Sequence, residues 1–475
     1  MKPYRLLAVL LMAMLFAGAI QAAAVLAEAE AGVQRYLFAS VHTLGDFHKK
    51  KGETFPDPLE QGMFVYDINA GHKLVKSFPA KSWKSWSGGW AGLAAHAGSG
   101  VLFQVQDGGA VRAYDIVGEK LLWETFQMNT GNVLKETDPE KRHQQFEQGI
   151  SYIDRRFGVT KDGKYVLLPD RDSAKRDKGV EKGLGVPVVR VLEATTGKWV
   201  KNIPLVDPQA ADKSKGEGSP HSVHVMSRYI YASQWNDGHV YCIDPQRLEV
   251  VRRLGPVVLN QETLPAGAAQ SDGERRGTEI AHGSQSIQHF SVDPEERYVY
   301  VEPVRAFGIG VIEVASGKFL GHWPMPEPAP GSLAAQRYAI PAAKANQLHS
   351  KRNHGIAVRP NSHEVWMTDD AWGLLHVWDV STMPPKYVAA VPVFEDIKQP
   401  IYDFSWVNFS IDGKYAYASN KVIDTDTKKV IAKLAGLNEA SIEIQLHNGK
   451  VVRTGHEMGS GLDTWVIGYE PGRQP

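Results

Sequence analysis

Histidines and other polar residues recur at one position of this sequence, at the start of short alternating strands. His354 opens the stretch from Asn353 to Val380, in which a strand, a Pro-Asn turn and two further strands follow. Alignment of similar stretches on their first turn places His221, Gln288, Arg155 and Ser405 at the position of His354. Imidazole groups bind protons and metals and guanidinium groups bind carboxylates, so this position predicts a binding site.

The loops between the second and third strands of each stretch are expected to return to the same end of the molecule. Aromatic side chains there would provide contact area and a few polar groups would fix the orientation of a small polar or planar ligand. The expected rim consists of Gln288, His289, Trp235, Asp369, Asp370, Trp372, Trp406 and Asn408. The alternative is that these residues have a structural role only. A histidine here would form a hydrogen bond with the backbone of a neighbouring repeat, and the tryptophans would pack in the core.

Three histidines are candidate metal ligands. Two or three imidazoles with a carboxylate bind a divalent metal, and a neutral imidazole also serves as an axial ligand of haem iron. The candidates for a divalent metal are His221, His224 and His354.

Hairpins with alternating apolar residues fill most of the chain and must position these side chains. Each unit has a strand, a turn and a strand, as in the run from Val292 to Glu302, followed by a second hairpin of the same kind. Such four-stranded units recur roughly every 45 to 70 residues, which is typical of a β-propeller. The sequence therefore predicts an all-β fold: a single β-propeller of four-stranded antiparallel blades, with eight blades favoured over seven. The strands of residues 440–470 either form the eighth blade or close the ring with the N-terminal strands.

The two ends and the insertions set the domain organisation. Residues 1–24 carry Lys2, Arg5, an apolar run and Ala22-x-Ala24, the layout of a cleaved signal peptide; an uncleaved anchor is the alternative. Residues 30–475 form the propeller, with loop insertions near 128–156, 206–219, 255–286 and 324–352. We therefore expect a periplasmic or secreted protein without a membrane span once the signal is removed.

The composition excludes several partners. Lys+Arg and Asp+Glu are both 53, so no net charge favours nucleic acid. Cys242 is the single cysteine, which excludes an intramolecular disulfide and a covalently attached c-type haem. The expected partners are a small molecule or another exported protein.

The repeat resembles that of known propellers. The segments HGIAVRPNSHEVWMTD and LLHVWDVST resemble the repeat of the YVTN/YncE-type propeller superfamily, which implies the fold and little about function. The layout is also similar to the haem d1 domain of cytochrome cd1 nitrite reductase and its relatives in haem d1 assembly. That similarity implies His221 and His354 as haem ligands, with Arg155 or Arg305 meeting the haem carboxylates. No c-type haem motif accompanies it.

Three functions remain open at this stage. The first is an exported binding or scaffolding propeller that holds a small ligand or a partner at the mouth of its central channel. The second is a haem- or metal-dependent protein for redox chemistry or cofactor handling. The third is a lactonase-like hydrolase in which rim carboxylates and histidines activate water. The sequence lacks the common nucleophile, phosphate-binding and zinc-protease motifs, and whether the protein is an enzyme stays open.

Overall fold

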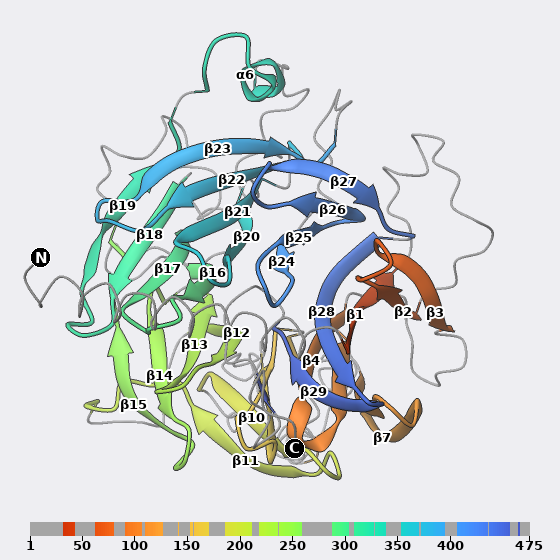
Figure 1. Cartoon of the computed structure of the whole chain (residues 1–475). Coiled ribbons are helices and arrows are strands. Elements are labelled where there is room, and N and C mark those ends of the chain that lie inside the picture. Colours follow the sequence, from red (N-terminus) through yellow and green to blue (C-terminus); the bar gives the residue numbers. More distant parts are fainter. Residues whose placement is uncertain are drawn as a thin grey trace, which may run out of the picture.

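The computed structural model of the chain is a ring of β-sheets with little helix (Figure 1). It describes residues 32–42, 62–79, 91–106, 110–126, 141, 153–154, 156–170, 186–210, 218–235, 237–258, 287–303, 308–326, 328–338, 353–369, 372–394, 406–435, 437–456 and 464–465. Within them, no helix has the length and apolar character needed to cross a membrane. The predicted signal peptide, residues 1–24, lies outside the described residues.

Six of the seven sheets in the described part have four antiparallel strands. Each is a blade whose first strand lies nearest the centre and whose fourth lies at the periphery (Figure 1). Three blades are β4 (Ala91–His96) to β5 (Val101–Gln106), β6 (Ala110–Asp115) and β7 (Lys120–Phe126); β8 (Gly158–Val159) to β9 (Tyr165–Asp170), β10 (Val188–Glu193) and β11 (Trp199–Pro204); and β12 (Ser219–Val225) to β13 (Ile230–Trp235), β14 (Val240–Asp244) and β15 (Glu249–Leu254). The other three are β16 (Ile287–Val292) to β17 (Tyr298–Pro303), β18 (Gly308–Glu313) and β19 (Phe319–Pro324); β20 (Asn353–Val358) to β21 (Glu364–Asp369), β22 (Leu374–Asp379) and β23 (Lys386–Pro392); and β24 (Asn408–Phe409) to β25 (Tyr415–Ala418), β26 (Lys421–Asp424) and β27 (Lys429–Lys433).

The seventh sheet contains both ends of the described chain. Its six strands follow the order β3-β2-β1-β28-β29-β30, and β1 pairs with β28 from Val33↔His447 to His42↔Leu437. These strands are β1 (Val33–His42), β2 (Gly62–Asp67), β3 (Lys73–Pro79), β28 (Leu437–His447), β29 (Lys450–Thr454) and β30 (Thr464–Trp465). The all-β propeller is confirmed, but the structure has seven sheets in its described part and not the eight that we favoured. The C-terminal strands close the ring by pairing with the N-terminal strands, which removes the open edges.

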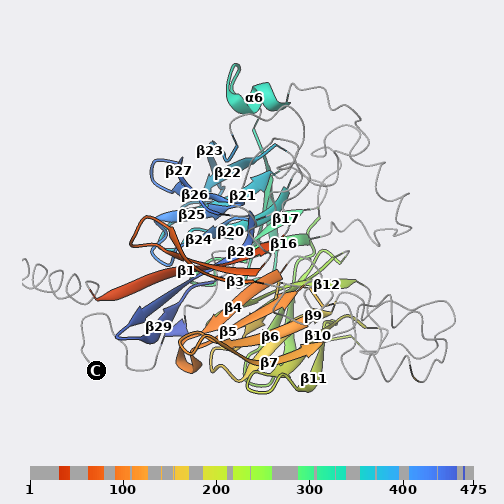
Figure 2. The same cartoon turned by 90° about the vertical axis from the view of Figure 1, so that its right-hand side faces the viewer.

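The described helices are short and lie outside the blades proper. They are the 3-10 helix η2 (Ala97–Ser99) and α6 (Leu333–Tyr338). In both the axial view and the edge-on view, α6 projects from the ring of sheets (Figure 2).

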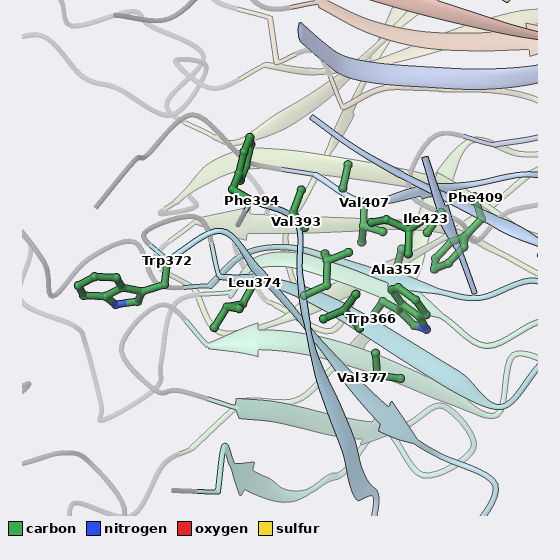
Figure 3. Packing of buried hydrophobic residues seen from close by; sticks show 14 of the residues in the cluster. Ala357, Trp366, Trp372, Leu374, Val377, Val393, Phe394, Val407, Phe409 and Ile423 are labelled. Atoms are coloured by element: carbon green, nitrogen blue, oxygen red, sulfur yellow. The ribbon is translucent and has the colours of Figure 1, made fainter. Parts of the chain in front are cut away.

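The core lies between adjacent blades. One cluster joins the β20–β23 blade to the β24–β27 blade, where Trp366 meets Phe409 edge to face at 5.6 Å between ring centroids (Figure 3). Each fully buried side chain of this size contributes about 1.5–3 kcal/mol through the hydrophobic effect. Close approach also demands glycine: Gly413 has φ +69°, and a Cβ there would collide with the carbonyl oxygen of Pro360 in the neighbouring blade.

The three inner strands β12, β16 and β20 share an irregularity near their first residues. The register shifts between Pro220 and Ser222, between Ile287 and His289, and between Asn353 and Ile356. A bulge of this kind turns a side chain away from the face of the strand on which regular alternation would place it. The shifts fall on His221, Gln288 and His354, the positions that the sequence alignment had equated.

Candidate functional site

The candidate site lies at the axis, at the end of the ring where the inner strands begin. His221 belongs to β12, His289 to β16, and Trp406 lies two residues before the first residue of β24. Arg156 lies two residues before the first residue of β8 and belongs to a fourth blade. The inner strands converge on the axis in Figure 1, which explains how residues so distant in sequence meet.

Arg156 links the first of these residues to an acid. Its Nη1 donates to Oδ1 of Asp154 at 2.9 Å and lies 2.9 Å from Nδ1 of His221. The second carboxylate oxygen of Asp154 lies 3.5 Å from the same imidazole nitrogen. Asp154 also accepts the backbone N–H of Arg156 at 3.1 Å, so the loop itself holds the acid in place.

The two histidines meet at the axis. The rings of His221 and His289 lie edge to face, with centroids 4.9 Å apart and planes at 86°. Nδ1 of His289 is 3.2 Å from Oε2 of Glu302, which stands beside it in register on β17. His289 also meets the Trp406 ring edge to face at 4.6 Å.

Trp406 contacts Arg156 as well as His289. Its ring lies 4.2 Å from the guanidinium carbon of Arg156, a cation–π distance. Contacts therefore run from Arg156 to His221, His289 and Trp406 and back to Arg156. We call the set of Asp154, Arg156, His221, His289, Glu302 and Trp406 the axial cluster.

The axial cluster is almost completely shielded from water. Arg156 is the most exposed member, with 5% of its surface accessible; Trp406 is 3% exposed and His221 is 2% exposed. The two acids, Asp154 and Glu302, are fully buried. Two carboxylates and one guanidinium thus share a region where an unpaired charge is costly. Polar contacts in such a dry region are strong and directional.

Other polar pairs lie at the same end of neighbouring blades, where the second strands finish. Asp170 accepts from Nε of Arg190 at 2.6 Å, and both side chains are fully buried. Asp369 lies 3.6 Å from Nε2 of His376. His224 lies three residues further along β12 than His221, towards the end of that strand, and packs on Phe290 with ring centroids 4.5 Å apart. Burial, followed by the charges of His224 and Arg453, lowers the pKa of His456 to about 3.

The structure brings together three of the residues predicted from sequence, namely His221, His289 and Trp406. Asn408 lies two residues beyond Trp406, and its amide nitrogen donates to Oγ of Ser441 at 3.1 Å. Trp372 is 1% exposed and belongs to the hydrophobic cluster between two blades. The residues that fall outside the description are Arg155, Arg305 and Asp370, and the side chains of Gln288, Trp235 and His354.

Three members of the axial cluster, Asp154, Arg156 and Glu302, are not among the site residues predicted from the sequence. The alignment selected Arg155, whereas the described contacts are made by its neighbour Arg156. The reason is local: the chain from Ile153 to Gly158 opposes the shorter stretch from Asp170 back to Leu167, so the inner strand carries extra residues there. Asp154 was missed too, although an acid two residues before an arginine was a visible signal.

A metal site is not formed by the described residues. No group of three or more His, Cys, Asp or Glu side chains with metal-binding geometry occurs within the part of the chain that the structure covers. Of the predicted metal ligands, His221 and His224 lie within that part, and the side chain of His354 lies outside it. Cys242 is buried, and burial raises the pKa of its thiol to about 12, which makes it inert.

Comparisons with known proteins show similarity of overall structure only. No protein-family profile matches the chain, and no curated protein sequence matches it. The solved structure of the dihydro-heme d1 dehydrogenase NirN in complex with DHE is similar at a TM-score of 0.46 and 14% identity. The match covers 90% of this chain and 75% of that chain.

Proposed function

We propose that this chain is an exported β-propeller that binds a small, flat, polar ligand at the axial cluster. One observation carries the proposal: Arg156, His221, His289 and Trp406, from four different blades, form a closed circle of contacts at the axis. Aromatic rings provide flat contact surfaces and the imidazoles and guanidinium provide directional hydrogen bonds, which is the usual composition of a small-molecule site. The amino-terminal signal pattern supports export.

Haem is the competing ligand, and the described residues do not fit iron ligation by His221. Nη1 of Arg156 lies 2.9 Å from Nδ1 and 3.5 Å from Nε2 of that ring. A guanidinium beside both ring nitrogens opposes a second cation at either of them. We therefore propose that the ligand of the axial cluster is an organic molecule that is not held by a metal bound to His221.

A lactonase-like activity is also less well supported. Its candidate residues were Asp369 and Asp370, and Asp369 lies beside His376 within its own blade.

The proposal is tested on protein isolated from the periplasmic fraction of its native host. The mature N-terminus is determined by mass spectrometry, and the denatured protein is analysed for released small molecules. We expect cleavage near Ala24, no Soret band, and one organic molecule in stoichiometric amount.

Two site variants and one control make the test specific. Trp406→Leu removes the flat surface and Arg156→Gln removes the charge, so both should lose the molecule. His363→Gln is the control. It changes an exposed residue in the turn between β20 and β21, at the end of that hairpin far from the first residues of β20, and the variant should retain the molecule. Absence of any molecule from the folded wild type, or its retention by both site variants, rules out the proposal; a Soret band identifies haem instead.

A further inference from the structure

Three polar side chains form a line across neighbouring strands of one blade: Tyr387 on β23, His376 on β22 and Asp369 at the end of β21 (Figure 1). The hydroxyl of Tyr387 lies 3.0 Å from Nδ1 of His376, and Nε2 of the same ring lies 3.6 Å from Oδ2 of Asp369. Asp369 and His376 are buried, whereas Tyr387 is half-buried on the outermost strand. The line therefore runs from the interior of the blade to its outer edge.

The carboxylate at the inner end favours proton movement in one direction. Oδ1 of Asp369 accepts the backbone N–H of Trp372 at 3.2 Å, and Oδ2 is the oxygen nearer the imidazole. A carboxylate only accepts hydrogen bonds, so Asp369 favours the tautomer of His376 with its proton on Nε2. Nδ1 then accepts the hydroxyl of Tyr387. The same negative charge stabilises the imidazolium that forms if Nδ1 takes up the phenolic proton.

A buried indole lies against the outer end of this line. Trp378 is the register partner of Tyr387 across β22 and β23, and their ring centroids are 5.3 Å apart with planes at 80°. Trp378 is 2% exposed, and its Nε1 has no hydrogen-bond partner within the part of the protein that the structure describes. An indole that has lost an electron sheds its N–H proton readily, but this N–H has no acceptor. The positive charge would therefore stay on the Trp378 ring until a neighbour supplies an electron.

A second tyrosine–histidine pair has a much weaker proton acceptor. The hydroxyl of Tyr417 lies 3.0 Å from Nε2 of His72. Burial, with a smaller effect from the charge of Arg35, lowers the pKa of His72 to about 4, although Asp67 acts in the opposite direction. An imidazole that disfavours its protonated form is a poor acceptor for a phenolic proton. Tyr417 is therefore a matched control for Tyr387.

We infer that Tyr387 is a redox-active tyrosine: it reduces an oxidised Trp378 and passes its proton to Nδ1 of His376. A strong one-electron oxidant, such as an inorganic radical or an oxidised ruthenium complex, first takes one electron from the indole. An electron then moves from Tyr387 to Trp378, the O–H bond breaks and an N–H bond forms on His376. The products are a neutral phenoxyl radical, an intact indole and an imidazolium beside Asp369.

The resting state is restored from outside. A small reductant such as ascorbate supplies one electron to Tyr387 at the outer edge of the blade, and the proton returns from His376. Electrons pass between rings in contact, so the buried indole needs no access for a ligand. This activity is independent of ligand binding at the axial cluster.

Protection of the core between two blades is the benefit of such a relay. Trp378 and Met367 belong to one hydrophobic cluster formed by the β16–β19 and β20–β23 blades. Oxygenation makes these side chains polar, and a polar group without a partner in a core is costly. A tyrosine that removes the oxidising equivalent keeps this cluster apolar. Burial, followed by the charge of Asp369, raises the pKa of Tyr387 to about 12, so its phenol holds the proton before oxidation.

The test is flash photolysis of the full mature protein with tris(bipyridine)ruthenium(II) as photo-oxidant and chloropentaamminecobalt(III) as irreversible quencher. Samples frozen during the decay are measured by EPR. Wild type should give a long-lived tyrosyl radical, whose spectrum narrows when the protein contains ring-deuterated tyrosine. Tyr387→Phe should lose this signal, and Tyr417→Phe should keep it at the wild-type yield.

His376→Gln separates proton transfer from hydrogen bonding. The amide can accept the hydroxyl of Tyr387 and donate to Asp369, but it takes up no proton at neutral pH. The yield of the long-lived radical should fall about tenfold or more, because each unit of acceptor pKa changes the equilibrium tenfold. His363→Gln, in an exposed turn, should keep the wild-type yield. Circular dichroism verifies that each variant is folded.

Peptide mass spectrometry of samples illuminated in air tests the direction of electron flow. Trp378 should stay intact in wild type and become oxygenated in Tyr387→Phe and in His376→Gln. Equal oxygenation of Trp378 in wild type and Tyr387→Phe overturns the inference. So does a folded wild type without a long-lived tyrosyl radical, a radical that survives Tyr387→Phe, or a wild-type yield in His376→Gln.

Discussion

Buried charge at the axis is the feature of single residues that most needs an explanation. Asp154, Arg156 and Glu302 are withdrawn from water where apolar side chains of the same volume would fill the centre at lower cost. Each is held by a partner within hydrogen-bond distance, so the arrangement is specific and not an accident of packing. A polar network of this kind is best explained by the ligand chemistry that it makes available.

His72, which lies outside the axial cluster, should make the stability of the fold depend on pH. Burial, with a smaller effect from the charge of Arg35, lowers the pKa of His72 to about 4, although Asp67 acts in the opposite direction. Its Nε2 lies 3.0 Å from the hydroxyl of Tyr417, and the side chain is 7% exposed. The unfolded chain takes up a proton near pH 6.5. Stability should therefore fall as the pH decreases from about 6.5 to 4, by at most about 3 kcal/mol from this residue.

The measurement is the thermal midpoint of unfolding between pH 7.5 and 4.5. His72 has φ +65°, so His72→Asn is the suitable substitution because asparagine tolerates this backbone conformation. The variant should lose stability at pH 7.5 but show a flatter pH dependence than wild type. His363→Asn, at an exposed position, should keep the wild-type slope. Parallel curves for wild type and His72→Asn would refute the assignment.

At the level of elements, turns hold neighbouring blades together. Glu296, in the β16–β17 turn, accepts the backbone N–H of Arg228 at 2.6 Å and the hydroxyl of Tyr231 at 2.9 Å in the preceding blade. Burial, followed by the charge of Glu296, raises the pKa of Tyr231 well above its usual value. The phenol thus remains a donor at all relevant pH values.

Removal of this carboxylate should loosen the contact between the two blades. Glu296→Ala leaves the buried hydroxyl of Tyr231 without its acceptor, and we expect a loss of about 2–3 kcal/mol in the free energy of unfolding. Tyr231→Phe removes only one of the bonds and should cost about 1 kcal/mol. Denaturant unfolding monitored by tryptophan fluorescence measures both. Equal losses for the two variants would show that the backbone bonds to Glu296 contribute nothing.

The elements were predictable because each carries its own local signal. Alternating apolar residues and turn residues such as Asp412-Gly413 define the hairpins without reference to the rest of the chain. The alignment of His221 with Gln288 and His354 agrees with the register, since all three fall where the inner strand shifts against its partner. The contact of Arg156 with His221 was not predictable to the residue, because the chain before Gly158 carries extra residues relative to its partner strand.

At the level of the whole molecule, the connections divide the ring into two unlike ends. The links from first to second strand and from third to fourth strand are short turns, such as Asp162–Lys164 and Ala194–Lys198. The links from β7 to β8, β15 to β16 and β19 to β20 are long, and they leave from the end at which the inner strands begin. The axial cluster lies at that end. Variable loops over a rigid ring are where propellers and other scaffolds place their binding residues.

Closure of the ring was the global property that local patterns left undecided. Both alternatives for the C-terminal strands agreed with their alternating residues, because a strand does not encode which distant edge it will join. The choice is made by contacts between the two ends of the chain. Arg35 on β1 donates from Nε and Nη2 to the two carboxylate oxygens of Glu443 on β28, at 2.7 and 3.0 Å.

The same guanidinium also reaches the adjacent blade, where Nη1 donates to Oδ2 of Asp412 at 2.9 Å. Burial alone would raise the pKa of Asp412, but its hydrogen bond with Arg35 and the charge of Arg35 outweigh this and lower it. The stabilisation from Asp412 should therefore be complete above pH 4 and be lost as the pH falls further.

Arg35→Met should weaken closure more than an ordinary surface change, because it leaves the fully buried carboxylate of Glu443 without a cation. We expect a loss of about 3–5 kcal/mol in the free energy of unfolding. Adding Glu443→Gln to Arg35→Met should recover part of this loss, since the amide is neutral and its oxygen can still accept the backbone N–H of Ile411.

Arg247→Met breaks an exposed pair with Asp244 and should cost less than about 1 kcal/mol. Denaturant unfolding of the four proteins measures these differences, and because one closed ring is expected to unfold cooperatively, the transition should shift as a whole. A loss for Arg35→Met no larger than that for Arg247→Met would mean that strand pairing between β1 and β28 closes the ring without help from this ion pair.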